Sequence, residues 1–408
     1  MTTNENSVKI PIPLSQLLEP GVDIKGGSKN LLNKKLMCSE SGKSYQIIRY
    51  DKDLLNHSLY SELGFFRSII LNLCDKKVSC ISPPKSLLLD EFINKYRFED
   101  VQVQEFVEGT MINVWWDESN NMWEISTRSS IGANVKFYLG TDSKTFKIMF
   151  NEALKESGLD LNNLPKQYCY SFVMQHPENR IVTPFSQTKL YIIDVFDITY
   201  KNDEIYVESY NLQSPSPSDQ ERNLKELLVK NDQIHLPKIY TDCNSYKEYI
   251  DKYSSGTISY EIVGIVFKHL NSSSRTKVRN PIYEQVRHLK GNHPKKQYRY
   301  LWLRSTGKMK IYLDYFPEDK SDFYDFRNMC HNFIDRVYKY YVGCYIKKEK
   351  GLKMYPFEYR THMIALHRLY VNILKPNDDY IRKFNVIEYF NSLHPSQQMF
   401  ALNYKMRN

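Results

Sequence analysis

One short stretch of the sequence, VQEFVEGTMINVWWDE, has residues that could take part in chemistry at the end of a predicted strand. Glu108 and Gly109 follow Phe106 there. A glycine lets a backbone approach a bound group closely, and a neighbouring carboxylate can orient that group. No lysine lies between Arg97 and Lys136. Arginine offers no free lone pair at any useful pH, so this segment lacks an amine nucleophile.

Six further segments follow an order that can be compared with known enzymes. Upstream, SELGFFRSIILN and KVSCISPPKSLLLDEF carry Arg67 and Lys85. Downstream, WEISTRSSIG carries Arg128, YSFVMQHPENRIVTPF contains Val173, and EIVGIVFKH contains Val263 followed by Gly264. A last stretch, RTKVRNPIYEQVRHLKGN, places two basic residues at alternate positions of a strand, Lys277 and Arg279.

In this order, these segments resemble the covalent nucleotidyltransferases, most closely the RNA ligases of the T-even phage type, over about residues 45 to 315. The resemblance implies an α+β fold, with an antiparallel-sheet nucleotidyltransferase domain of the ATP-grasp-like ligase type. It also implies a lysine that takes AMP from ATP, at the position held here by Phe106. The residues that match the nucleotide-binding positions are Glu108, Gly109, Arg128, Lys277 and Arg279.

Three positions that carry charge in the ligases are apolar here: Phe106 for the lysine, Val173 for a ribose-binding glutamate and Val263 for a metal-assisting glutamate. Side chains alternate along strands, so we expect these three to face one cleft that is partly closed and apolar. Losing the charged groups together avoids leaving a buried charge without its ligand. Two alternatives stay open: Glu261 could replace the lost acid at Val263, or the alignment could be shifted by one residue.

Basic and aromatic residues are concentrated in residues 275–310, which predicts a surface for single-stranded RNA. The alternative is a solvated amphipathic helix whose tyrosines pack in a core. With the two upstream residues of the ligase comparison, the predicted RNA-binding set is Arg67, Lys85, Arg287, Lys290, Lys295, Lys296, Arg299 and Arg304.

Composition favours a globular, intracellular protein. The chain has 408 residues with a formal charge of +9, and its seven cysteines form no CxxC pair. It has no membrane-length apolar run and no signal-peptide layout, so we expect no membrane association and a cytoplasmic location, in a host cell or virion if the source is viral. His176, His362 and His367 show no ligand spacing, and we expect no metal site.

Sequence patterns predict three regions. Residues 1–45 are expected to be an irregular lead-in, 46–316 the ligase-like domain, and 317–408 a small all-α domain. In the last region, Phe323, Cys330, Phe333 and Val337 recur at helical spacing. This helical domain is a candidate surface for a protein partner.

Three functions are compatible with the sequence. The leading hypothesis is an RNA-ligase-like protein that binds RNA ends or nucleotide without covalent nucleotidyl transfer and without a certain cofactor. The second is an active ATP-dependent RNA ligase or capping-type guanylyltransferase that uses ATP and Mg²⁺ and a displaced lysine, Lys85 or Lys277. The third is a structural or assembly subunit.

Overall fold

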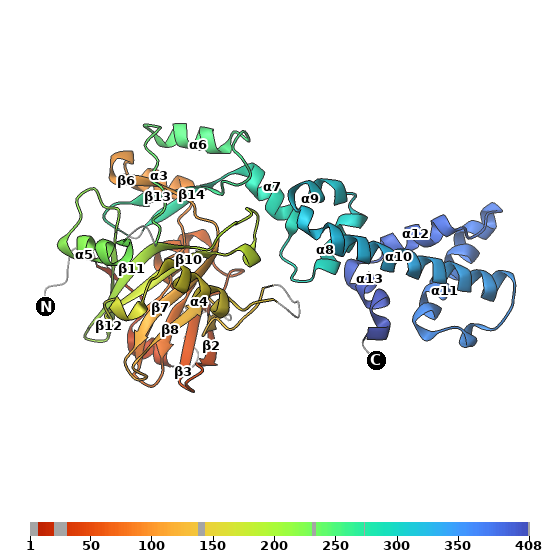
Figure 1. Ribbon diagram of the computed structural model, residues 1–408, viewed down its shortest axis with the longest axis horizontal. Helices are drawn as coiled ribbons and strands as arrows, with labels where there is room; N and C mark the ends of the chain where they lie inside the picture. Colours follow the sequence, from red (N-terminus) through yellow and green to blue (C-terminus); the bar gives the residue numbers. More distant parts are fainter. Residues whose placement is uncertain (1–6, 20–30, 138–142, 231–233, 273, 407–408) are drawn as a thin grey trace. The chain divides into compact units, whose positions relative to one another are not determined.

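The computed structural model describes residues 7–19, 31–137, 143–230, 234–272 and 274–406 (Figure 1). The chain forms two compact units, Met1–Gln285 (unit 1) and Val286–Asn408 (unit 2). The expected α+β character with antiparallel strands is confirmed, since every pair of strands runs antiparallel in the described residues.

Unit 1 contains three sheets. The seven-stranded sheet has the order β1 (Val8–Lys9), β12 (Glu204–Tyr210), β11 (Lys189–Lys201), β10 (Tyr168–Gln175), β7 (Thr110–Asp117), β8 (Met122–Thr127) and β9 (Ser130–Ile131). The four-stranded sheet has the order β2 (Leu32–Cys38), β3 (Ser44–Tyr50), β4 (Ile69–Asn72) and β5 (Lys77–Ile81). The three-stranded sheet has the order β14 (Arg275–Arg279), β13 (Gly264–His269) and β6 (Val101–Glu105).

The expectation of an irregular lead-in is wrong for its described part. β1 pairs with β12, α1 spans Leu14–Leu18, and β2 pairs with β3 along its full length. β2 is an edge strand in which Leu32 alone is buried. An edge strand with exposed lysines lacks the alternating apolar pattern, which is why the sequence hid it. Residues 20–30 lie outside the described part of the chain.

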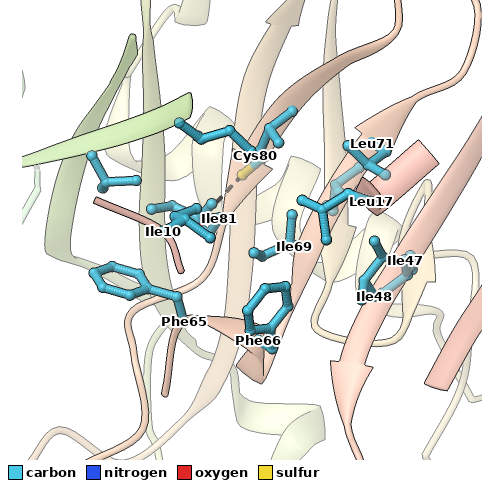
Figure 2. Packing of buried hydrophobic residues seen from close by; sticks show 14 of the residues in the cluster. Ile10, Leu17, Ile47, Ile48, Phe65, Phe66, Ile69, Leu71, Cys80 and Ile81 are labelled. Atoms are coloured by element: carbon cyan, nitrogen blue, oxygen red, sulfur yellow. Dashed lines mark hydrogen bonds between the residues drawn. The ribbon is translucent and has the colours of Figure 1, made fainter. Parts of the chain in front are cut away.

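Three apolar cores pack the described sheets and helices of unit 1 together. The first core joins the four-stranded sheet to one face of the seven-stranded sheet, and Phe65, Phe66 and Ile69 lie within it (Figure 2). The second joins the other face to α4 (Phe146–Ser157) and α5 (Asp219–Leu228). The third packs the three-stranded sheet against α3 (Leu89–Lys95) and α6 (Tyr246–Ser254). These cores fix the strand ends around which the candidate site is built.

Unit 2 is helical in its described residues. Its helices are α8 (Lys296–Ser305), α9 (Met309–Tyr315), α10 (Lys320–Tyr341), α11 (Phe357–Leu369), α12 (Lys383–Ser392) and α13 (Pro395–Leu402), and α7 (Pro281–Lys290) spans the boundary between the units. The predicted stripe on α10 is buried at Phe323, Cys330, Phe333 and Val337. No helix in the described ranges is both long and apolar enough to cross a bilayer.

The boundary between the units precedes the predicted one near residue 316. α8 packs against α10, α12 and α13, and α9 packs against α8. The basic segment before residue 316 therefore folds mainly with the C-terminal helices. Charged residues conceal the apolar face of α8, where Tyr300, Leu301 and Leu303 are buried.

Candidate nucleotide-binding cleft

Phe106 lies directly after β6, where the three-stranded sheet meets β7 and β10. Its amide donates a hydrogen bond of 3.2 Å to the carbonyl of Gly264 on β13. The ring lines two hollows in unit 1. The first is bounded by Val173, Ile193 and Val266 together with basic side chains, and the second by Glu108, Tyr240 and Val263.

Two glycines allow the backbones around Phe106 to approach closely. Gly109 has a φ of +152°, and an added Cβ would lie 2.5 Å from the Met174 carbonyl oxygen and 2.7 Å from a methyl group of Val173. Gly264 has a φ of +139°, and an added Cβ would lie 2.1 Å from the Val278 carbonyl oxygen. Both positions therefore require glycine, on steric grounds and on backbone conformation.

Glu108, expected beside the nucleotide, holds a loop of the protein. Its carboxylate accepts hydrogen bonds from the Val182 amide at 2.6 Å and the Thr183 amide at 3.1 Å. The side chain is buried, and this burial raises the pKa of Glu108 although its hydrogen bonds oppose the shift. The residue thus fixes the segment after β10, and it still lines the second hollow.

The Phe106 ring lines one hollow with each of the other two apolar replacements. Phe106 shares the first hollow with Val173 and the second with Val263. Glu261, the alternative acid, lies in the turn before β13 and also lines the second hollow. The first hollow has a free volume of about 100 Å³. Pockets for small molecules typically have roughly 300–1,000 Å³, so the first hollow is narrow.

Basic side chains surround the Phe106 ring. The Lys277 ammonium and the Arg279 guanidinium each lie 5.6 Å from the ring centroid, within range of a cation–π interaction. Other cations lie close enough to repel Lys277. Further arginines repel those cations in turn. We call this set the cation cluster: Arg49, Arg67, Lys85, Arg128, Arg275, Lys277 and Arg279.

Mutual repulsion and burial shift the pKa values of this cluster. Burial of the Lys277 ammonium, together with repulsion from the nearby arginines, lowers the pKa of Lys277 to about 7. Lys277 as a whole residue is exposed, and solvent reduces this shift. Burial likewise lowers the pKa of Arg67 to about 9, and it lowers the pKa of Arg128.

Two carboxylates neutralise part of this charge. Asp194 on β11 accepts from Lys268 at 2.7 Å and from Arg275 at 3.3 Å. Glu284 pairs with Arg279. The cations stay in excess, and such an arrangement attracts phosphate groups. Lys85 is held differently, 4.2 Å from the centroid of the Tyr60 ring.

Sequence reasoning missed Asp194 and Lys268. Both are charged residues inside the buried apolar runs of their strands, β11 and β13. A charged residue inside such a run is buried only with a partner, and that rule was the available signal. It could not identify the partner, because residues 194 and 268 meet only through the tertiary fold.

Several predicted RNA-binding residues of unit 2 are structural. Arg299 is buried, with bonds to the Lys290 carbonyl at 2.7 Å and to Asp319 at 3.4 Å. Lys296 pairs with Asp319 and Asp322. The buried Lys290 ammonium lies 4.7 Å from the Phe316 ring centroid.

Arg304 also packs inside unit 2, with its guanidinium 5.6 Å from the Phe390 ring centroid. Lys295 is exposed and Arg287 is half-buried. The predicted surface is therefore divided between the two units, and part of its charge stabilises unit 2 instead of facing solvent.

The histidines have structural partners. His176 bonds to Glu152 at 2.9 Å and accepts from the Glu178 amide, while His362 bonds to the Tyr389 hydroxyl at 2.9 Å. Among the described residues, no group of three or more histidine, cysteine or acidic side chains could hold a metal ion.

A phage protein is similar to this chain in sequence. It is an RNA ligase of Rhodothermus phage RM378, with 25% identity over 271 residues, which make up 59% of this chain and 58% of the phage protein. The chain thus matches little more than half the length of that ligase. No protein-family model matches the sequence.

Solved structures of ligases also align with the chain. An archaeal ATP-dependent RNA ligase aligns at 13% identity with a TM-score of 0.37, covering 76% of this chain and 77% of that one. A Naegleria gruberi RNA ligase mutant with ATP and Mn aligns at 13% identity with a TM-score of 0.35, covering 50% and 58%. At these scores the structural similarity carries no argument. The similarity to an RNA ligase therefore rests on the sequence comparison with the phage protein.

Proposed function

We propose that unit 1 binds a phosphorylated RNA end or a nucleotide without forming a covalent bond to it. The observation that carries the proposal is the Phe106 ring at the expected lysine position, with Lys277 and Arg279 each 5.6 Å from its centroid. Part of the same proposal is that the chain derives from ligases of the T-even phage type and has lost their reactive lysine.

The chemistry of the cleft supports binding of a terminal nucleotide. Cations of the cluster can neutralise a terminal phosphate, and the apolar wall of Val173, Ile193 and Val266 can contact the adjoining base. The free volume of about 100 Å³ suits the phosphate directly. A whole nucleotide requires the Phe106 ring to move aside.

The expected chemistry of transfer has no counterpart at the three replaced positions. Covalent transfer needs an amine whose lone pair attacks the α-phosphorus, and a phenyl ring has none. Val173 and Val263 have no carboxylates. ATP and Mg²⁺ would be needed only by an active ligase.

Binding of three RNAs that differ only at their ends tests the proposal. The oligonucleotide carries a 5′-phosphate, a 3′-phosphate or two hydroxyl ends, and fluorescence anisotropy measures its affinity for the full chain. We expect a phosphorylated end to bind more tightly, and Lys277→Gln to remove most of that difference. Lys201→Gln is the matched control, because Lys201 is exposed on β11 and does not line the first hollow. Equal affinity for all three RNAs would contradict the proposal.

The position of Lys277, whose ammonium lies 5.6 Å from the centroid of the Phe106 ring, favours a second function, an ATP-dependent RNA ligase or capping-type guanylyltransferase. A pKa near 7 leaves a large share of the Lys277 amine neutral and nucleophilic at physiological pH. That amine could attack the α-phosphorus of ATP, form a P–N bond and release pyrophosphate. An RNA-sealing assay separates the functions: sealing by the parent chain that Lys277→Ala abolishes and Lys85→Ala preserves would establish this alternative.

The third function is that of an assembly subunit, with a protein partner bound by the helical unit. It would be favoured over both RNA functions if the chain co-purified in a protein complex and bound no RNA at either low or high salt concentration.

A further inference from the structure

The positive charge of the chain is concentrated in unit 2. Residues Val286–Asn408 contain 23 lysines and arginines against 11 acidic residues, whereas the rest of the chain contains 33 against 36. The net charge is therefore about +12 in unit 2 and about −3 in unit 1, by the same count. Unit 2 is the part of the chain suited to attract a polyanion.

This basic unit contains a hollow with aromatic walls. It lies among α11, α12, α13 and the short turn Tyr404–Met406, and its free volume of about 490 Å³ is in the range of small-molecule sites. Phe357, Tyr389, Phe400 and Tyr404 line it. Phe357 and Phe400 are exposed by 63% and 52%, so part of each ring reaches the solvent.

A carboxylate with one oxygen that accepts no hydrogen bond lies at the wall of this hollow. The side chain of Glu358 is only 9% exposed, and its Oε1 atom is buried and accepts no hydrogen bond. The Lys405 ammonium lies 3.6 Å away, too far for a good hydrogen bond. Lys405 is itself 71% exposed on the last described turn, so its side chain can move away and admit another donor.

We propose that this hollow binds an unpaired guanine base of single-stranded RNA. The aromatic side chains stack on the base, Glu358 accepts its N–H groups after Lys405 moves aside, and the net positive charge of unit 2 attracts the backbone. The inference takes RNA as the ligand from the proposed function, and it concerns a separate site in the other unit.

The acceptor chemistry of Glu358 selects guanine among the four bases. An ionised carboxylate only accepts hydrogen bonds, and it can accept two side by side. The Watson–Crick edge of guanine presents two adjacent N–H donors, from N1 and the N2 amino group. Adenine and cytosine each present one amino group beside a ring-nitrogen acceptor, and uracil presents one N–H between two carbonyls. Guanine alone can donate one hydrogen bond to each carboxylate oxygen. It also places no acceptor opposite the carboxylate.

Anisotropy with uridine hexamers tests this assignment on the full chain. One central residue is guanosine, inosine or adenosine, and all ends are hydroxyl, so the cleft in unit 1 is not challenged. We expect guanosine to bind more tightly than adenosine by roughly tenfold or more, the discrimination typical of a bidentate base contact. Inosine lacks the N2 amino group and should fall between them.

Glu358→Gln should abolish the preference for guanosine, because an amide offers one acceptor and one donor. Glu388→Gln is the matched control, since Glu388 is exposed on α12 and does not line the hollow. Should Glu358→Gln fail to fold, photo-crosslinking of 6-thioguanosine RNA to the unaltered chain replaces it. A crosslink at Phe400 or Tyr404 supports the site, and crosslinks only elsewhere overturn it.

Each outcome separates the two proposals. Equal affinity for guanosine and adenosine hexamers overturns the base site, and the cleft proposal is still decided by phosphorylated ends. A guanosine preference without any preference for phosphorylated ends supports the base site and overturns the cleft. No binding of any RNA overturns both.

Discussion

The pair of salt bridges at Asp194 gives the sharpest stability prediction. The side chains of Asp194, Lys268 and Arg275 are exposed by only 4%, 8% and 11%. Asp194→Asn would leave two buried cations without a charged partner, and breaking a buried pair costs about 3–5 kcal/mol. The cost should lie toward the upper end of this range, because one carboxylate serves both cations.

Urea unfolding followed by tryptophan fluorescence measures this cost. Three of the four tryptophans lie in unit 1, so the signal reports mainly on that unit. Asp219→Asn is the control: Asp219 pairs with Arg222 on the surface of α5, with side chains exposed by 89% and 60%. Such an exposed pair contributes less than about 1 kcal/mol.

A double variant checks the cause. Adding Lys268→Met to Asp194→Asn removes one unpaired cation and should restore part of the lost free energy of unfolding. If Asp194→Asn costs no more than Asp219→Asn, the buried charge network does not hold β11 to the three-stranded sheet, and the reasoning is refuted.

Further effects on stability and RNA binding are expected in both units. Gly264→Ala should destabilise unit 1 by about 2 kcal/mol or more in the same urea assay, because the new Cβ meets the Val278 carbonyl oxygen in a strained backbone; an unchanged midpoint would contradict the close approach of β13 to β14. Affinity for a phosphorylated RNA end should fall as the pH rises through 7, since Lys277 loses its proton there, and Lys277→Gln should flatten that profile; a flat profile in the parent would refute this role. Because the folded-state pKa of Lys277 is lowered, the unfolded chain binds more protons between pH 7 and 10.5, so this group's contribution to stability increases with pH in that window. In unit 2, Arg299→Met should lower the free energy of unfolding by about 3–5 kcal/mol in thermal unfolding. Lys295→Gln should instead weaken RNA binding and reduce its salt dependence, with little effect on stability. The reverse pattern would show that Arg299 contacts RNA and Lys295 stabilises the fold.

The strands around the cleft could be predicted from sequence because they carry strong local signals. The run KLYIIDVFDI is β11, and Gly109 and Gly264 stand where close backbone contacts require glycine. The roles of charged residues were harder to predict. Arg299 and Lys295 are both basic residues in one polar stretch, and only the fold shows that Asp319 holds the first inside unit 2 while the second faces solvent.

The hollow at Glu358 was hidden from sequence reasoning for the same physical reason. Glu358 is an ordinary first-turn acid of α11, and Lys405 lies far along the chain. Their proximity depends on how α13 packs in unit 2, which no local pattern encodes. The sequence marked the helical domain only as a candidate surface for a protein partner, and the structure adds a cavity to that expectation.

The central claim is that a phenyl ring has replaced the reactive amine of a nucleotide-handling cleft. The most direct test is incubation of the full chain with labelled ATP or GTP and a divalent metal ion, followed by denaturing electrophoresis. We predict no labelled protein band from the parent chain. A stable covalent protein–nucleotide band, lost in Lys277→Ala, would contradict the claim and identify an active nucleotidyltransferase.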